Sequence, residues 1–184
     1  MSHTDHADAP TDPTQNGSGE TIEIRTPTVE DGAGMWALAK GTGVLDLNTP
    51  YAYILWARDF APTSVVSLVD GQLAGFISGY IRPDAPQTLF IWQVGVDSAF
   101  RGRGLAKKML FDVIARSGAS RLETTITADN EASIALFTAL ARHHGTEITR
   151  RDLFGTDLFP PASASGEEHA AEDLYTVEPL RTDT

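Results

Sequence analysis

A short glycine-rich turn at residues 101–106 carries the residues best suited to chemistry in this chain. It lies between a predicted buried strand and a predicted helix, where unpaired backbone N–H groups and the helix dipole together attract anions. Gly102 and Gly104 permit a positive φ and close approach of the backbone to a ligand. Of the 14 Lys and Arg residues in a chain of net charge −11, four gather here: Arg101, Arg103, Lys107 and Lys108. The turn predicts a site for a phosphate-bearing ligand; the alternative is a solvated basic turn.

Two common phosphate-binding loops do not fit the spacing of this turn. The dinucleotide-binding fingerprint needs a third glycine, which residues 102–107 lack, and the chain contains no G-x-x-x-x-G-K-[ST] sequence. The pattern Arg101-x-x-Gly104-x-Ala106 instead resembles the acetyl-coenzyme A (acetyl-CoA) pyrophosphate loop of the GNAT superfamily of N-acetyltransferases. In that superfamily the loop also follows an apolar strand, so the resemblance implies acetyl-CoA as the ligand.

The resemblance assigns further residues to the acetyl-CoA site. In GNAT proteins the strands that flank the loop splay apart, and a free backbone N–H of the first strand meets the thioester carbonyl. That donor is expected between Val94 and Val96, with a bulge near Gly95. Part of the following helix completes the site. The residues expected to bind the coenzyme are Val94, Val96, Arg101, Gly102, Arg103, Gly104, Leu105, Ala106, Asn130 and Ser133.

An acetyltransferase of this kind lets the acceptor amine attack directly, so it needs a group that takes a proton from the ammonium ion. The candidates for this base are Asp46, Glu123, His169 and Glu172. Asp46 has an alternative role as a brace for its own loop, and His169 as a solvated loop residue. The acidic residues around His169 lack a second histidine on a rigid element, so no metal site is expected.

Protonation of the departing thiolate is a separate requirement. Many GNAT proteins carry a tyrosine near the position of Phe137, and phenylalanine cannot donate a proton. Either Tyr51 or Tyr175 serves as the acid, or the thiolate leaves without a side-chain acid.

Five blocks of sequence, at 45–53, 56–60, 79–84, 89–94 and 122–130, together resemble the diaminobutyrate acetyltransferase family. Members of that family make N-γ-acetyl-diaminobutyrate on the route to ectoine, a compound of osmotic protection. The resemblance implies acetyl-CoA as donor, a free diamino acid as acceptor, a homodimer and a cytoplasmic location.

The acceptor implied by this resemblance carries two ammonium groups and one carboxylate. Asp46 and Glu172 are expected to hold the ammonium groups through charge-assisted hydrogen bonds. Tyr51 and Trp92 are expected to contact the aliphatic chain or an ammonium face, with core packing as the alternative role of Trp92, and Arg82 is the candidate partner of the carboxylate. Two rival functions stay open, because a fold does not establish a reaction. They are acetylation of another small amine or a peptide, and non-catalytic binding of coenzyme A.

The composition narrows the class of protein further. The 184 residues include no cysteine, which excludes disulfides and thiol catalysis and suits a reducing cytoplasm. The net charge of −11 disfavours nucleic-acid binding, which needs basic surfaces. No apolar run approaches the length of a membrane-spanning helix, and no signal peptide is apparent at the N-terminus. Neither a nucleic acid nor a membrane is expected as a partner.

Periodicity and turn signals predict the elements that must position these residues. Strands are expected at 21–25, 64–69, 73–81, 88–96, 121–127, 147–154 and 174–178, with helices at 28–39, 50–59, 105–118 and 130–145. This order, β-α-α-β-β-β-α-β-α-β-β, is that of the GNAT fold. The expected fold class is therefore α/β, with a mixed, splayed central sheet flanked by helices.

One domain is expected at residues 21–180. Residues 1–20 contain no aromatic or branched aliphatic side chain, so they cannot bury enough apolar surface to offset the entropy of ordering and are expected to be disordered. Residues 181–184 form a short tail. A long loop is expected at 160–172, and long loops inside compact domains are often functional.

Overall fold

The computed structural model describes residues 14–15, 19–165 and 168–181. Most of the predicted N-terminal tail and the residues after 181 lie outside this part of the chain. The strands are β1 (Thr14–Gln15), β2 (Thr21–Arg25), β3 (Val65–Val69), β4 (Gln72–Arg82), β5 (Ala85–Val96), β6 (Arg121–Thr127), β7 (Ile148–Phe154) and β8 (Glu172–Val177). The helices are α1 (Gly32–Thr42), α2 (Pro50–Asp59), α3 (Leu105–Ser117), α4 (Glu131–His143) and the one-turn α5 (Ala162–Ser165). The predicted order of the main elements is confirmed.

Local sequence explains where several elements begin and turn. Thr49 caps α2, because its side chain accepts a hydrogen bond from the backbone N–H of Ala52 at 3.3 Å, and Pro50 suits the first helical position. The predicted hairpin between β3 and β4 is confirmed at Asp70 and Gly71. Both residues have positive φ, 49° and 80°, as the tight turns that suit a twisted hairpin require.

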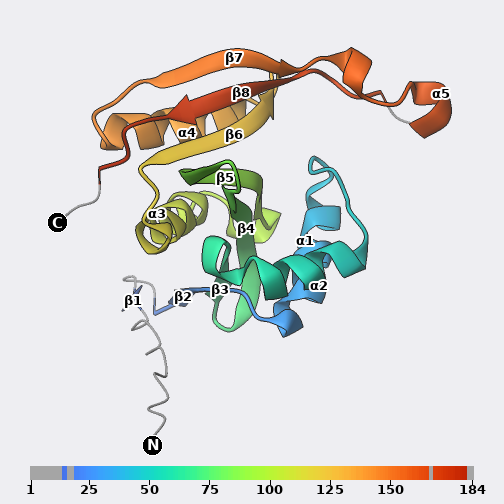
Figure 1. Cartoon of the computed structure of the whole chain (residues 1–184). Coiled ribbons are helices and arrows are strands. Elements are labelled where there is room, and N and C mark those ends of the chain that lie inside the picture. The colour runs from blue at the N-terminus through green and yellow to red at the C-terminus, as the bar shows by residue number, and fades with distance from the viewer. Residues whose placement is uncertain (1–13, 16–18, 166–167, 182–184) are drawn as a thin grey trace, which may run out of the picture.

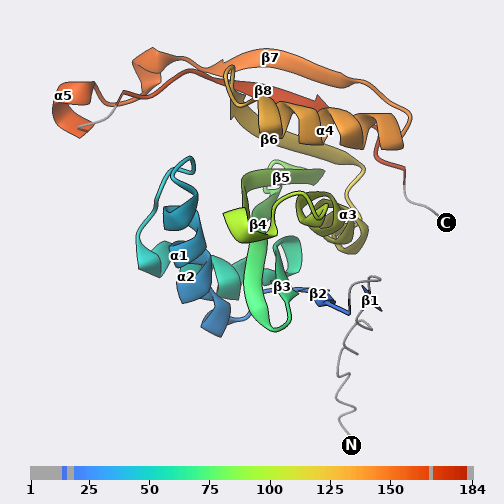
Figure 2. The same cartoon turned by 180° about the vertical axis from the view of Figure 1, so that it is seen from behind.

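The strands form one sheet in the order β1-β2-β3-β4-β5-β6-β8-β7, and every neighbouring pair is antiparallel except β5 and β6. The β5–β6 pairing runs only from Thr88↔Arg121 to Ile91↔Thr124, although β5 continues to Val96 and β6 to Thr127. Beyond Ile91 the two strands diverge. The sheet is therefore splayed at this seam, as the GNAT resemblance implied, and Figures 1 and 2 show β6, β8 and β7 set apart from the other strands.

Helices cover both faces of the sheet. Helices α1 and α2 pack together on one face, where Met35, Tyr53 and Phe76 belong to one buried cluster (Figure 1). Helices α3 and α4 contribute to the largest core cluster, with Met109 from α3 and Leu140 from α4 packed around strands of both halves of the sheet. The glycine-rich turn at residues 101–106 leads into α3, and the α1–α2 connection with its predicted acceptor residues lies on the opposite face.

A β-bulge in β5 lies at Trp92. In the β4–β5 ladder Ser78 pairs with Gln93 and Gly79 with Ile91, so Trp92 has no partner residue. The extra residue reverses the alternation of side chains, which puts Val94 in the α3-side core with Ile91. The bulge expected near Gly95 is therefore wrong in position. Gly95 pairs regularly with Phe76, and an added Cβ would lie 2.8 Å from the Phe76 ring, so packing against that ring demands glycine.

The predicted loop at 160–172 contains the one-turn helix α5 and ends where Glu172 begins β8. Within the part of the chain that the structure describes, no helix has the length and apolar character needed to cross a membrane.

Candidate functional site

The divergence of β5 and β6 exposes one edge of β5. The backbone N–H of Asp97 donates to the carbonyl of Ala74 at 2.9 Å, so these two residues form a hydrogen-bonded pair between β5 and β4. Hydrogen-bonded and non-hydrogen-bonded pairs alternate along an antiparallel ladder. The N–H groups of Val94 and Val96 therefore point away from β4. No strand pairs with that edge of β5 beyond Ile91 within the described sheet. Two backbone donors therefore face the open seam.

A cleft of about 1140 Å³ follows this seam. Its walls include the end of β5, the beginning of α4 and residues at the start of α3. Six of the predicted coenzyme-binding residues line it, namely Val94, Val96, Arg101, Ala106, Asn130 and Ser133.

The glycine-rich turn provides backbone donors at one end of this cleft. The first helical bond of α3 runs from Lys108 N–H to the Gly104 carbonyl at 3.0 Å, so the N–H groups of residues 105–107 have no partner within the helix. Gly102 and Gly104 have φ of 78° and 71°, and an added Cβ at either would meet no atom within 4 Å. Backbone conformation, not crowding, demands glycine there. These donors and the helix dipole suit the pyrophosphate of acetyl-CoA.

Two predicted coenzyme-binding side chains have other contacts. Arg103 forms an ion pair with Glu20 at 2.5 Å and lies over the Phe100 ring. The Leu105 side chain is buried in a core cluster with Ile22, so only its backbone N–H is available to a ligand. Of the two cations within the turn, Arg101 is thus the one whose side chain lines the cleft.

A second cavity of about 660 Å³ lies on the other side of the seam. The predicted acceptor residues Asp46, Trp92 and Glu172 all line it, although they come from the α1–α2 connection, β5 and β8. Asp46 follows Leu45, which lines the coenzyme cleft, so the two cavities lie next to each other. The other lining residues are Trp56, Tyr80, Arg82, Phe90, Glu123, Thr125, Arg151, Leu153, Phe154, Phe159 and Leu174.

Aromatic rings form one wall of this acceptor cavity. Trp56 lies against Trp92 with ring centroids 4.4 Å apart, and Tyr80 lies against Phe90 at 5.2 Å. Trp56 on α2 and its stacking partner Phe60, the residue that follows α2, are four residues apart, a spacing that places side chains on one helix face. That spacing was the available signal for Trp56, which sequence reasoning missed together with Tyr80. Such faces suit an aliphatic chain that carries cationic groups.

The backbone of Asp46 is held in place by β5. Gln93 donates a hydrogen bond from Nε2 to the Asp46 carbonyl oxygen at 2.8 Å. The bulge at Trp92 is what puts both Trp92 and Gln93 on the side of the sheet that Asp46 occupies. Within the described residues, the Asp46 carboxylate itself has no hydrogen bond or ion pair, and the same is true of Glu172.

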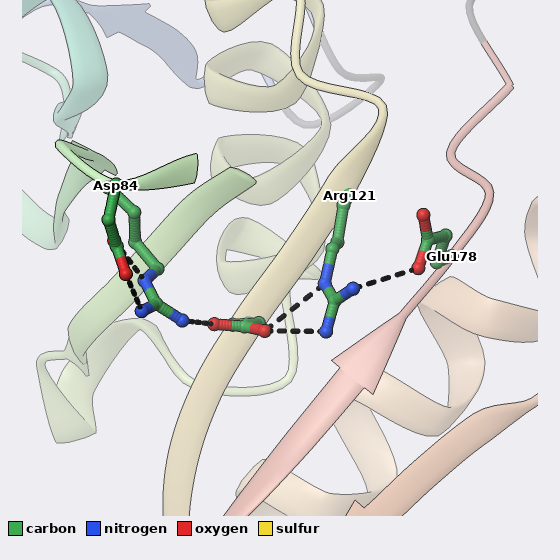
Figure 3. Close-up of polar contacts among 5 residues, drawn as sticks. Asp84, Arg121 and Glu178 are labelled. Carbon is green, nitrogen blue, oxygen red and sulfur yellow. Dashed lines mark hydrogen bonds and ion pairs between the residues drawn. The ribbon is translucent and has the colours of Figure 1, made fainter. Parts of the chain in front are cut away.

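Glu123, a predicted base, forms ion pairs with two arginines. Its Oε1 accepts hydrogen bonds from Arg121 Nε and Nη2 at 3.1 and 2.7 Å, and its Oε2 accepts from Arg82 Nη1 at 2.7 Å. Asp84 binds the rest of the Arg82 guanidinium, and Glu178 binds Arg121 (Figure 3). Hydrogen bonds from Arg82 to Glu123 and to Asp84 raise the Arg82 pKa.

This network leaves neither Glu123 nor Arg82 free for an acceptor. Both carboxylate oxygens of Glu123 already accept hydrogen bonds from guanidinium groups, and Arg82 already holds two carboxylates. The network instead joins the end of β4 to β6 across the intervening strand β5. The sequence reading of Arg82 as a carboxylate partner is therefore replaced by a structural role.

The remaining candidates lie at the margin of the acceptor cavity or away from it. Tyr51 is 69% exposed and does not line the cavity. His169 stacks on Phe159, a lining residue, with ring centroids 5.0 Å apart. Tyr175, a candidate acid for the thiolate, and Phe137 are buried in the main core cluster, and neither lines the cleft or the acceptor cavity. Among the described residues no group of three His, Asp or Glu side chains is placed to hold a metal ion, and Glu167 lies outside them.

Comparison with known proteins shows the family to which this chain belongs. The model of the acetyltransferase (GNAT) family matches residues 35–141. The L-2,4-diaminobutyric acid acetyltransferase of Nocardia farcinica is 47% identical over 163 residues, which cover 87% of this chain and 81% of that protein. The chain belongs to the diaminobutyrate acetyltransferase family. The Streptomyces anulatus member of this family is also 47% identical, with 89% and 93% of the two chains covered.

A solved structure of the same family agrees with the fold. The diaminobutyrate acetyltransferase of Paenibacillus lautus, in complex with L-2,4-diaminobutyric acid and coenzyme A, superposes with a TM-score of 0.81 at 36% identity. The match covers 89% of this chain and 98% of that one. The resemblance that the sequence motifs carried is thereby confirmed at the level of family and fold.

Proposed function

We propose that this protein transfers the acetyl group of acetyl-CoA to the γ-amino group of L-2,4-diaminobutyrate, giving N-γ-acetyl-diaminobutyrate for ectoine biosynthesis. One observation carries the proposal: a coenzyme-sized cleft and a smaller cavity with two unpaired carboxylates adjoin at the seam between β5 and β6. Family membership at 47% identity supports the same substrates.

The coenzyme site is built largely from backbone donors. The free N–H groups at the start of α3, with Arg101, would hold the pyrophosphate, and α4 would border the rest of the coenzyme. Acetyl-CoA supplies an activated acyl group when bound. The N–H group of either Val94 or Val96 would donate to the acyl oxygen and stabilise its developing charge, an effect worth about 3 kcal/mol for one well-placed donor.

The acceptor cavity provides the charge and the proton acceptor that an amine needs. An alkyl ammonium has a pKa of about 10, so at neutral pH it must lose a proton before it can attack. Asp46 and Glu172 would bind the two ammonium groups, and one of these carboxylates, directly or through a water, would accept the proton. Trp92 would contact the aliphatic chain. Since Phe137 has no proton to donate and Tyr175 is buried in the core, the thiolate would be protonated by solvent or by a group at the cavity margin.

An assay with a panel of acceptors tests the proposal against its rivals. Coenzyme A release is measured with L-2,4-diaminobutyrate, spermidine and a short peptide at equal concentrations. We expect the diamino acid to react fastest and NMR of its product to show acetylation at the γ-nitrogen. Faster turnover of the polyamine or the peptide would contradict the proposal, and binding of acetyl-CoA without turnover of any amine would indicate the non-catalytic alternative.

We further propose that the active form is a cytoplasmic homodimer. Exposed apolar side chains support an interface, since such patches on soluble proteins commonly mark binding surfaces. They are Val44, Leu47, Tyr51 and Ile54 around the beginning of α2, with Phe154 at the end of β7 and Leu158 after it. Light scattering on the purified protein should give twice the chain mass of 19.8 kDa. Recovery of the native protein in the cytosolic fraction would support the location.

A further inference from the structure

We propose that Arg151 binds the carboxylate of the acceptor and so makes the enzyme specific for diamino acids over plain diamines. This inference rests on the proposed function and assigns one further residue to it. Five charged side chains line the acceptor cavity, namely Asp46, Arg82, Glu123, Arg151 and Glu172.

Two of these five charges are already neutralised by the protein. Glu123 accepts from Arg82 and Arg121, and Arg82 also binds Asp84 (Figure 3). The other three lack such partners. Among the described residues, no hydrogen bond, ion pair or ring contact involves the side chain of Arg151, Asp46 or Glu172. The cavity thus offers two carboxylates and one guanidinium, the complement of an acceptor with two ammonium groups and one carboxylate.

The sheet register places Arg151 close to Glu172 without pairing them. Arg151 lies opposite Leu174 in the β7–β8 ladder, and Glu172 is two residues from Leu174 on the same face. Such diagonal neighbours in an antiparallel pair are about 7–8 Å apart at Cα. Their charged groups are separated by more than the 4.0 Å of an ion pair. An α-amino acid carries its ammonium and carboxylate on one carbon, so it fits between an unpaired carboxylate and an unpaired guanidinium.

The chemistry of arginine suits this task. Its planar guanidinium can donate two parallel hydrogen bonds to a carboxylate, which adds orientation as well as energy. Arg151 and Glu172 lie on β7 and β8, across the seam from the Val94 and Val96 N–H groups on β5. If Glu172 and Arg151 bind the α-amino and α-carboxyl groups there, the distal amine would face the acyl group. Charge placement would thus support acetylation at the γ-nitrogen.

The neighbouring residue gives a matched control. Arg150 is the adjacent arginine on β7, but it points to the other face, where it binds Asp173 at 2.8 Å and lies over the Tyr175 ring. Asp173 raises the Arg150 pKa by this hydrogen bond. Substitution of Arg150 therefore removes the same charge from the same strand without touching the acceptor cavity.

The test compares two acceptors that differ only in the carboxylate. L-2,4-diaminobutyrate and 1,3-diaminopropane are assayed for coenzyme A release with wild-type protein, Arg151→Gln, Arg151→Lys and Arg150→Gln. We expect Arg151→Gln to lower kcat/KM for the diamino acid by about 30-fold, as loss of a charge-assisted pair would, and to change it for the diamine by less than about twofold. Arg151→Lys should recover part of the loss, and Arg150→Gln should keep the wild-type ratio.

Three results would overturn the assignment. An Arg151→Gln variant that keeps the wild-type ratio would show that the carboxylate is bound elsewhere. An equal loss for both acceptors, with coenzyme affinity and melting temperature unchanged, would assign Arg151 to the reaction in general instead of to the carboxylate. Wild-type protein that acetylates other amines but not diaminobutyrate would overturn the proposed function itself, and the role of Arg151 with it.

Discussion

Replacement of Asp46 by asparagine separates acceptor binding from structural support. The structure gives the two parts of this residue different contacts. Its backbone carbonyl accepts from Gln93 at 2.8 Å and from Asn48 at 3.4 Å, whereas its carboxylate has no hydrogen bond or ion pair among the described residues. Asparagine keeps the shape and both backbone contacts, so only the negative charge that faces the acceptor cavity is lost.

The size of the effect follows from the exposure of the site. Asp46 is exposed in the protein alone, so its interaction with an ammonium is weaker than that of a fully buried pair. A charge-assisted hydrogen bond in such a setting is worth about 2 kcal/mol, which corresponds to about a 30-fold fall in kcat/KM for diaminobutyrate. Stability should change by less than about 0.5 kcal/mol, because no contact of the carboxylate is removed.

Three measurements on the variant decide the matter: kcat/KM for diaminobutyrate, acetyl-CoA affinity by calorimetry, and the melting temperature. Asp59→Asn serves as the control, since Asp59 is an exposed residue that pairs with Arg58 at the end of α2 and does not line the acceptor cavity. If Asp46→Asn lowered the melting temperature and left kcat/KM within about threefold, a shift of ~0.6 kcal/mol, the residue would be a brace for its loop and the acceptor role would be refuted.

Three other predictions test the coenzyme site, the support of Asp46 and the acid sensitivity of the fold. Gly104→Val should abolish acetyl-CoA binding in calorimetry, because a branched residue disfavours the φ of 71° at this position. The control Gly118→Val, at a similar φ of 64° at the far end of α3, should bind acetyl-CoA normally. Equal affinities of the two variants would contradict the assignment. Gln93→Leu removes the bond to the Asp46 carbonyl and should raise KM for diaminobutyrate about tenfold with acetyl-CoA affinity unchanged, and an unaltered KM would argue against this support. Burial raises the pKa of Asp31, but hydrogen bonds from Arg25 and the Thr28 N–H and the charge of Arg25 outweigh it and leave that pKa below its ordinary value. Asp31 therefore contributes stability that is present above the unfolded-state pKa of about 4 and is lost as pH falls through the folded-state pKa. In urea unfolding, Asp31→Asn should lose less stability than wild type between pH 7 and pH 3. An equal loss in the two proteins would contradict this.

The sequence predicted the order of elements because its signals are local. The cap at Thr49, the turn at Asp70 and Gly71, and the glycines before α3 act within a few residues, so they can be read along the chain. The family resemblance added Asp46, Trp92 and Glu172, which the structure places around one cavity.

Features that depend on pairing between distant segments could not be predicted in this way. The bulge at Trp92 exists only relative to β4, and this one extra residue puts Val94 on the same face as Ile91, where simple alternation would put it on the opposite face. The ion pairs of Glu123 likewise depend on a distant segment, because its partner Arg82 lies 41 residues away in the chain. Arg151 stands in a run of polar residues on β7, where alternation alone does not say which face borders a cavity.

The short seam between β5 and β6 also bears on how a product leaves. Only four residue pairs join the strands there, so the sheet consists of two leaves joined over a short stretch. Asp46 and Trp92 belong to one leaf, and Glu172 belongs to the other. In the proposed complex, an acceptor with two ammonium groups would contact a carboxylate of each leaf. Acetylation would turn one ammonium into a neutral amide, so the product would make one charged contact fewer than the acceptor and would dissociate more readily.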